Sequence, residues 1–166
     1  AGGAKWMGDS VVSAVVEAIG ERSVTDYWKV TAWLRGYRAR MLAAMDAEGV
    51  DVLLTPPFAT PALQHGASKA FLPAGAFAIL FNVLQFPAGV VPVTRVRADE
   101  TRRGNVRGRL ESQAAKVDEH SEGLPVGVQV VARPWREDVV LSLMAAIEQD
   151  VSPSAGFPTT PITPAS

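Results

Sequence analysis

The residues of this sequence that could act as nucleophiles are serines and threonines, because it contains no cysteine. A catalytic serine needs a base within hydrogen-bonding reach and a turn that exposes its oxygen. None of the serines lies in a G-x-S-x-G elbow or an S-x-x-K pair. Ser68 and Lys69 are adjacent, but neighbouring side chains seldom face each other, and a loop after Gly66 is the simpler interpretation. We therefore expect no complete catalytic serine site in this chain.

Metal and cofactor sites have no better support. The absence of cysteine excludes disulfides, zinc–thiolate sites and iron–sulfur clusters. His65 and His120 are the only imidazoles, and they lie far apart in polar surroundings. No G-x-G-x-x-G turn or Walker loop is present to hold phosphate groups. We expect this chain to bind no metal and no cofactor.

The charge composition bears on the partners. The chain has 16 lysines and arginines against 17 aspartates and glutamates, so no global positive field attracts nucleic acid or an anionic membrane. Six arginines lie within residues 95–109, and acidic residues follow as far as position 122. Basic clusters that bind nucleic acid usually contain interleaved aromatic residues, and this one has none. We interpret residues 95–122 as a polar surface insertion, with nucleic acid not a partner.

The sequence also lacks membrane and secretion signals. Its longest apolar runs are far shorter than the roughly 18–20 residues that span a bilayer. The first residues have neither an initiator methionine nor the charged-then-apolar pattern of a secretion signal. We therefore expect the chain to be part of a longer protein.

Helices and strands are expected to alternate along the chain. Ser23 followed by Asp26 predicts the start of the strongest helix, and Gly49 predicts its end. Its apolar stripe, which includes Tyr27 and Val30, is expected to face inward along its whole length. The other expected elements are helices at 10–19, 73–84 and 134–147 and strands at 50–54, 89–94 and 126–132.

This alternation predicts an α/β fold, in which part of a mixed β-sheet is covered by helices. Residues 50–54 form a short apolar run and are expected to be a strand buried on both faces. Pro92 within a strand indicates an edge or a bulge. Residues 1–150 are expected to form the domain, and residues 151–166, rich in proline and threonine, a disordered tail.

Sites in α/β sheets lie beyond the carboxyl ends of the strands. Residues 55–66 and 132–136 follow two of the expected strands, so they are candidate walls of a site. Three strands leave a sheet with uncovered edges, and we expect sequence outside this chain to supply their neighbours.

Several separate blocks of the sequence resemble the carboxy-terminal part of amidase-signature enzymes, and most closely the branch of fatty acid amide hydrolases. The resemblance covers residues 22–148, apart from the arginine-rich insertion. The blocks are Arg22-Ser23, Trp28-Lys29, residues 51–56 (DVLLTP), 82–94 (NVLQFPAGVVPVT), 123–129 (GLPVGVQ) and Pro134-Trp135.

The resemblance implies a serine hydrolase that cleaves carboxamides, with fatty acid amides as expected substrates. Such enzymes use a nucleophilic serine, a second serine and a lysine base. Those residues belong to an upstream signature that is absent here, so we expect this chain to contribute no catalytic residue and to be inactive alone. It would instead provide scaffold and a wall of the acyl channel.

The resemblance also assigns roles to individual residues. The positions matching the acyl channel and the family motif near it are Leu72, Gly75, Ile79 and Trp135 for substrate contact, and Asn82, Pro87, Gly89 and Gln129 for the motif. An apolar helical stripe is equally typical of core, and Asn82 and Gln129 are interpreted as structural hydrogen-bonding residues. Thr55, at a strand end, and Gln64, in the following loop, could face the site, but the local sequence is equally typical of ordinary turn hydrogen bonds.

The partners implied are a small apolar amide substrate and the remainder of the amidase domain. The resemblance is also compatible with a homodimer, an intracellular location and peripheral membrane contact through upstream segments. Two alternatives stay open: a noncatalytic α/β binding or interaction module derived from an amidase, and a nucleic-acid module that uses the arginines of residues 95–109.

Overall fold

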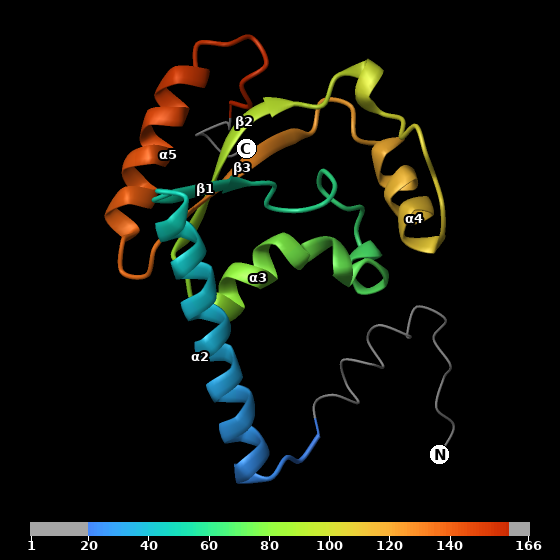
Figure 1. Ribbon diagram of the computed structural model, residues 1–166. Coiled ribbons are helices and arrows are strands. Elements are labelled where there is room, and N and C mark those ends of the chain that lie inside the picture. The colour runs from blue at the N-terminus through green and yellow to red at the C-terminus, as the bar shows by residue number, and fades with distance from the viewer. Residues whose placement is uncertain (1–19, 160–166) are drawn as a thin grey trace, which may run out of the picture.

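The computed structural model describes residues 20–159, in which helices cover both faces of a three-stranded sheet (Figure 1). The helix expected at residues 10–19 and the end of the expected tail, residues 160–166, lie outside the described residues. The elements in chain order are α2 (Val24–Ala47), β1 (Val52–Thr55), η1 (Ala67–Ala70), η2 (Leu72–Gly75), α3 (Ala76–Leu84), β2 (Ala88–Arg95), η3 (Ala98–Glu100), α4 (Arg109–Asp118), β3 (Pro125–Ala132) and α5 (Glu137–Val151).

Helix α2 begins and ends where its sequence signals predict. The Ser23 hydroxyl accepts a hydrogen bond from the Asp26 amide at 3.1 Å and donates one to the Asp26 carboxylate at 2.7 Å. These bonds complete the first turn of the helix. Gly49, just beyond the last turn, has a φ of 64°, a left-handed conformation that glycine adopts without steric cost.

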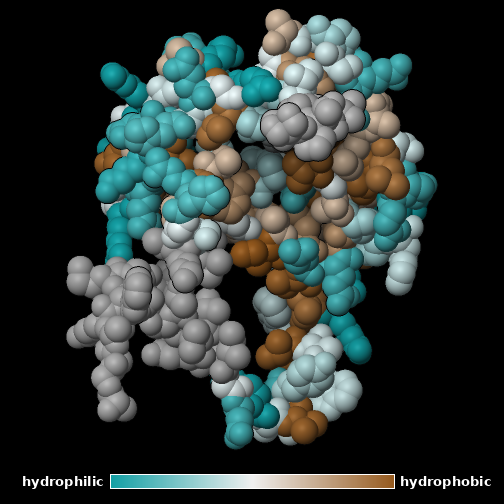
Figure 2. Space-filling model, turned by 180° about the vertical axis from the view of Figure 1, so that it is seen from behind, coloured by the Kyte–Doolittle hydropathy of each residue, from teal (hydrophilic) through white to brown (hydrophobic). Residues whose placement is uncertain are grey.

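The first half of α2 does not face a core in the described part of the chain. Tyr27 is 63% exposed and Val30 64% exposed, whereas Met45 near the other end is only 4% exposed. Within the described residues, the inward face is therefore confined to the later half of α2, because the elements that pack against α2 contact only its later turns. Figure 2 shows apolar residues running down this projecting part of the molecule.

The sheet has the order β1-β3-β2, and both pairs are antiparallel. The expectation that the first strand is buried on both faces is wrong, because β1 is at an edge of the described sheet and Leu54 is 58% exposed. The second half of the central strand β3 is buried instead, with Val130 and Val131 fully inaccessible. The register of β2 shifts between Pro92 and Thr94, as the proline predicts.

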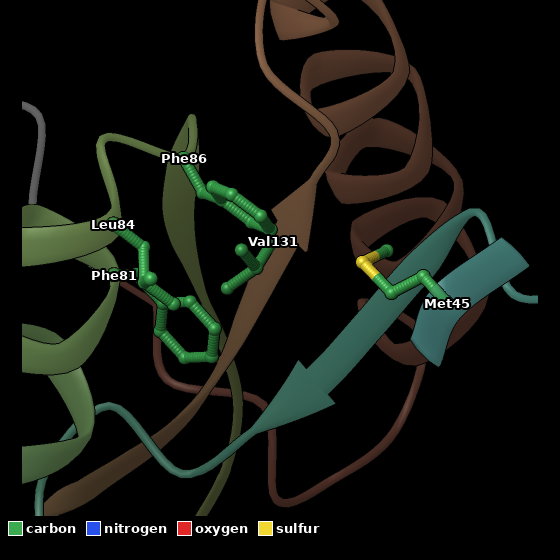
Figure 3. Packing of buried hydrophobic residues seen from close by; sticks show 5 residues of the cluster. All are labelled: Met45, Phe81, Leu84, Phe86 and Val131. Atoms are coloured by element: carbon green, nitrogen blue, oxygen red, sulfur yellow. The ribbon is translucent and has the colours of Figure 1, made fainter. Parts of the chain in front are cut away.

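Two apolar layers hold the helices to the sheet. On one face, Val131 packs with Phe81 and Leu84 of α3, with Phe86 of the loop that follows α3, and with Met45 of α2. Figure 3 shows the rings of Phe81 and Phe86 on either side of Val131, with Met45 farther along near β1. On the other face, a second cluster packs α5 against the sheet and contains Val130, Ala132, Val139, Val140, Leu143, Met144 and Ile147. Alternating residues of β3 therefore serve opposite layers.

The polar segment contains a helix, and the first residues of the expected tail form turns. Helix α4 lies within the polar segment of residues 95–122, where the sequence predicts no helix, and its Ala114 packs with Phe71 and Ala74. Residues 152–159 form turns and Pro158 is buried, and the expected disorder of the tail stays a prediction. None of the helices between residues 20 and 159 is long and apolar enough to cross a bilayer.

Candidate functional site

A cleft of about 810 Å³ opens where β1 ends and β3 begins, and we call it the β1-end cleft. Its volume is within the range of small-molecule sites in proteins. Its walls come from the loop after β1, the end of β2, the segment around η3, the end of α4 and the start of β3. The lining residues are Pro56, Pro57, Phe58, Ala59, Thr60, Pro61, Ala62, Leu63, Ser68, Thr94, Val96, Glu100, Arg102, Arg103, Asp118, Ser121, Pro125, Val126 and Gly127.

One of the two loops that the sequence indicates as site walls lines this cleft, and the other does not. Residues 56–63 line it. Residues 132–136 lie at the opposite end of the sheet, because β3 runs antiparallel to β1 and pairs Thr55 with Gln129 and Val52 with Ala132. The rule that sites gather at the carboxyl ends of strands applies to parallel sheets.

The proline-rich wall of the cleft is fixed by backbone hydrogen bonds. The Ala59 amide donates to the Ala74 carbonyl at 3.0 Å, which joins the loop to η2. Thr60 is 9% exposed, and its hydroxyl donates to the Pro61 carbonyl at 3.1 Å. Prolines further restrict this loop, since each fixes its own φ. The wall is therefore preorganised.

An ion pair between Arg103 and Asp118 lies in the cleft. The Nε of Arg103 is 2.5 Å from Oδ2 of Asp118, and Nη2 is 3.3 Å from Oδ1. The Asp118 side chain is only 9% exposed. Nη2 of Arg103 also donates to the Ala59 carbonyl at 3.4 Å, so the pair links α4 to the proline-rich wall. The sequence gives no signal for this pairing within a stretch that has many arginines and acids.

Other arginines of the polar segment also bind groups of the same chain. Arg97 forms ion pairs with Asp99 at 3.3 Å and with Glu100 at 2.9 Å. Arg95 donates to the Gly123 carbonyl at 2.8 Å. These contacts use the cations internally, which favours the interpretation of a surface segment over a nucleic-acid site.

The predicted acyl-channel residues Leu72, Gly75 and Ile79 lie in consecutive turns of η2 and α3. Ile79 is 46% exposed. A Cβ built on Gly75 would lie 3.4 Å from Cε2 of Phe58 and 3.8 Å from Cδ1 of Ile79. The structure therefore brings this part of the predicted wall together with Phe58 of the β1-end cleft, a residue that the sequence did not single out.

Trp135 lies elsewhere. It follows β3 in the turn before α5, at the end of the strand away from the β1-end cleft, and it is 88% exposed with a φ of 66°. In the same turn, the guanidinium of Arg136 donates two hydrogen bonds to Asp138, at 3.0 and 3.1 Å. These bonds lower the pKa of Asp138 and raise the pKa of Arg136. The predicted substrate contact of Trp135 stays a prediction.

The predicted motif residues occupy structural positions. The carbonyl of Asn82 accepts the Gln85 amide at the end of α3, and the carbonyl of Pro87 accepts the Ala132 amide at 3.1 Å. Gly89 lies under α5, where a Cβ would overlap Sδ of Met144. Gln129 is buried and donates to Thr55 across the sheet.

Several serine hydroxyls in the described chain form local hydrogen bonds. Ser121 donates to the Asp118 carbonyl at 2.7 Å, and Ser112 donates to the Gly108 carbonyl at 2.8 Å. Between residues 20 and 159, no group of three or more histidines, aspartates and glutamates is placed to hold a metal ion. What the described residues offer is a cleft with a proline-rich wall and an exposed apolar helix.

The sequence is similar to those of several fatty acid amide hydrolases. The fatty-acid amide hydrolase 1 of Sus scrofa is 35% identical over 147 residues, which are 86% of this chain and 25% of that protein. The fatty acid amide hydrolase 1 of Caenorhabditis elegans is 35% identical over 119 residues, or 69% of this chain and 21% of that protein. The fatty acid amide hydrolase of Arabidopsis thaliana is 32% identical over 109 residues, or 60% of this chain and 14% of that protein.

A solved structure of a fatty acid amide hydrolase has the same fold over the matched part. Its TM-score is 0.58 at 18% identity, and the match covers 78% of this chain and 24% of that one. The chain thus spans about a quarter or less of the length of the relatives it matches. The family model described as Amidase matches residues 6–141. The chain therefore belongs to the amidase family.

Proposed function

We propose that this chain is the carboxy-terminal portion of an amide hydrolase that acts on fatty acid amides and related apolar amides. It contributes the scaffold and part of the acyl-binding wall, and the nucleophilic serine and its lysine base come from the remainder of the amidase domain. Membership of the amidase family supports amide hydrolysis. Two relatives named fatty acid amide hydrolase 1, each 35% identical, support an apolar acyl group.

The observation that carries the structural part of this proposal is the apolar character of α3, in which eight of the nine residues are apolar on its buried and exposed sides alike. Its Phe81 and Leu84 are buried under the sheet. Its remaining large apolar side chains are 36–46% exposed, namely Phe77, Ile79, Leu80 and Val83. A helix that is apolar all round is typical of the interior of a larger protein. We assign its outer face to the acyl substrate and to the rest of the domain.

The first half of α2 supports the same assignment. Tyr27, Trp28, Val30 and Trp33 are 58–64% exposed along this helix. Monomeric proteins rarely expose apolar patches of this extent, because water disfavours them. Further elements of the amidase domain would cover these side chains and pair with the open edges of β1 and β2.

Labelling of the full-length protein with a fluorophosphonate probe tests the proposal. The probe bonds to an activated serine oxygen through phosphorus and releases fluoride, and peptide mass spectrometry then identifies the labelled serine. We expect labelling of one serine outside residues 1–166, together with hydrolysis of a fatty acyl amide. An unlabelled and inactive protein would contradict amide hydrolysis, and a labelled serine within residues 1–166 would contradict the assignment of the nucleophile to the remaining sequence.

A further inference from the structure

We infer that Phe58 sets the width of the acyl-binding surface by occupying the space that Gly75 leaves free beside Ile79. This inference rests on the proposed function, because it concerns how that site selects its acyl group. The ring of Phe58 belongs both to the wall of the β1-end cleft and to the surface of η2. A Cβ on Gly75 would be 3.4 Å from Cε2 and 3.9 Å from Cδ2 of this ring.

The position of the ring is fixed from two sides. The next residue, Ala59, donates its amide hydrogen to the Ala74 carbonyl at 3.0 Å, immediately before Gly75. The Phe58 side chain itself packs against the buried cluster of Phe71, Ala74 and Ala114. A ring held by both a backbone hydrogen bond and apolar packing acts as a preorganised wall.

Gly75 and Phe58 are therefore complementary in size. The 3.4 Å distance leaves room for one methyl group on residue 75 at ordinary contact. A β-branched side chain has two branches beyond Cβ, and these would meet Phe58 or Ile79. Beside Ile79, the space is filled by the Phe58 ring from the loop after β1 and not by a side chain at position 75 of η2.

Removal of the ring would join the β1-end cleft to the surface formed by Gly75 and Ile79. An acyl chain bound along this surface would gain width, whereas its length would be little affected. We therefore assign to Phe58 the exclusion of bulky acyl groups in favour of straight ones. Substrate width is selected in this way when a pocket wall leaves no space for additional carbon atoms.

The test uses four forms of the full-length protein: the unmodified protein, Phe58→Ala, Gly75→Ile and the double variant. The measured quantity is the ratio of kcat/KM for a ring-bearing acyl anilide to that for a straight-chain fatty acyl anilide. We expect Phe58→Ala to raise this ratio about tenfold. Gly75→Ile alone should lower the thermal unfolding midpoint, and adding Phe58→Ala should relieve part of that loss.

Leu141→Ala is the matched control, because Leu141 is an apolar residue that is 65% exposed on α5. It should not change the ratio of kcat/KM values, and combined with Gly75→Ile it should not relieve the loss in the unfolding midpoint. An unchanged ratio in an active Phe58→Ala protein would overturn the inference, and so would additive shifts of the unfolding midpoint in the double variant. Absence of hydrolysis by the unmodified protein would instead contradict the proposed function, and the unfolding midpoints would still decide whether residues 58 and 75 share one space.

Discussion

Gln129 donates a hydrogen bond from Nε2 to the hydroxyl oxygen of Thr55 at 2.9 Å, between residues that lie directly opposite each other in β3 and β1. Thr55 is the last residue of β1, and Pro56, the first residue of the cleft wall, follows it. Gln129 is only 3% exposed, so this hydrogen bond forms away from bulk water. The pair fixes the point at which the proline-rich loop leaves the sheet.

Replacing Gln129 with leucine should lower the free energy of unfolding by about 1–2 kcal/mol, because it removes the donor to the partly buried Thr55 hydroxyl while keeping most of the side-chain volume. Chemical denaturation of the full-length protein measures this change. Gln149→Leu on the exposed surface of α5 is the control and should have little effect. Combining Gln129→Leu with Thr55→Val should cost less than the sum of the single changes. Additive costs would show that the two side chains do not stabilise each other.

The sequence predicts that Thr55 lies at a strand end and that Gln129 lies in a strand, but it does not predict that the two residues contact each other. Local patterns predict the strands that contain them, because strands and turns leave short-range signals in apolar spacing and proline. Strand direction leaves no such signal, since an apolar run reads the same in a parallel and an antiparallel sheet. This is why the sequence places residues 55–66 and 132–136 near one site, although they lie at opposite ends of the sheet.

The cleft was only partly predictable for a related reason. The proline-rich wall follows a strand and could be located, whereas its partner wall includes Arg103 and Asp118 from a stretch that composition marks only as polar. Fifteen positions separate these two residues, and many other charges lie between and around them. Which arginine pairs with which acid depends on the fold that surrounds them.

The ion pair of Arg103 and Asp118 yields a second prediction. Arg103→Ala should lower the free energy of unfolding by about 1–3 kcal/mol, because the nearly buried Asp118 carboxylate loses its partner. Thermal unfolding of the full-length protein measures the loss. Arg102→Ala is the matched control in the adjacent position, and it should have a much smaller effect. The double variant Arg103→Ala with Asp118→Ala should recover part of the stability; no recovery would contradict the pairing.

The turn before α5 gives a pH-dependent prediction. Hydrogen bonds from Arg136 lower the pKa of Asp138 in the folded protein. A lowered folded pKa means that the carboxylate stabilises the fold above the ordinary aspartate pKa of about 3.9, and that this contribution disappears as the pH falls through the folded pKa. Asp138→Asn should therefore lower the unfolding midpoint at neutral pH and have progressively less effect in acid.

Glu137→Gln separates this contribution from the helix dipole. Glu137 and Asp138 both lie in the first turn of α5, where negative charge is favourable. The hydrogen bonds from Arg136 are to Asp138. We expect Glu137→Gln to have the smaller effect at neutral pH. Equal effects of the two substitutions would attribute the stabilisation to helix polarity alone.

Gly89 provides a prediction about helix packing. Alanine at this position would place its Cβ in overlap with Sδ of Met144 and 3.2 Å from Cγ1 of Val140, so α5 or Met144 must shift. Such overpacking should reduce stability by about 1–3 kcal/mol in a denaturation experiment. Met144→Ala should restore part of the loss in the double variant. Gly104→Ala is the control, since a Cβ there meets no described atom within 4 Å.

The final prediction concerns the proposed acyl wall on α3. Ile79 is 46% exposed and lies beside Gly75, so tryptophan at position 79 would extend into the space assigned to the substrate. In the full-length protein, Ile79→Trp should lower kcat/KM for long acyl amides about tenfold relative to short ones. Val106→Trp is the control, because Val106 is equally exposed but lies outside the β1-end cleft and α3. If the preference across acyl lengths did not change, Ile79 would not contact the acyl chain, and the exposed face of α3 would be assigned to domain packing alone.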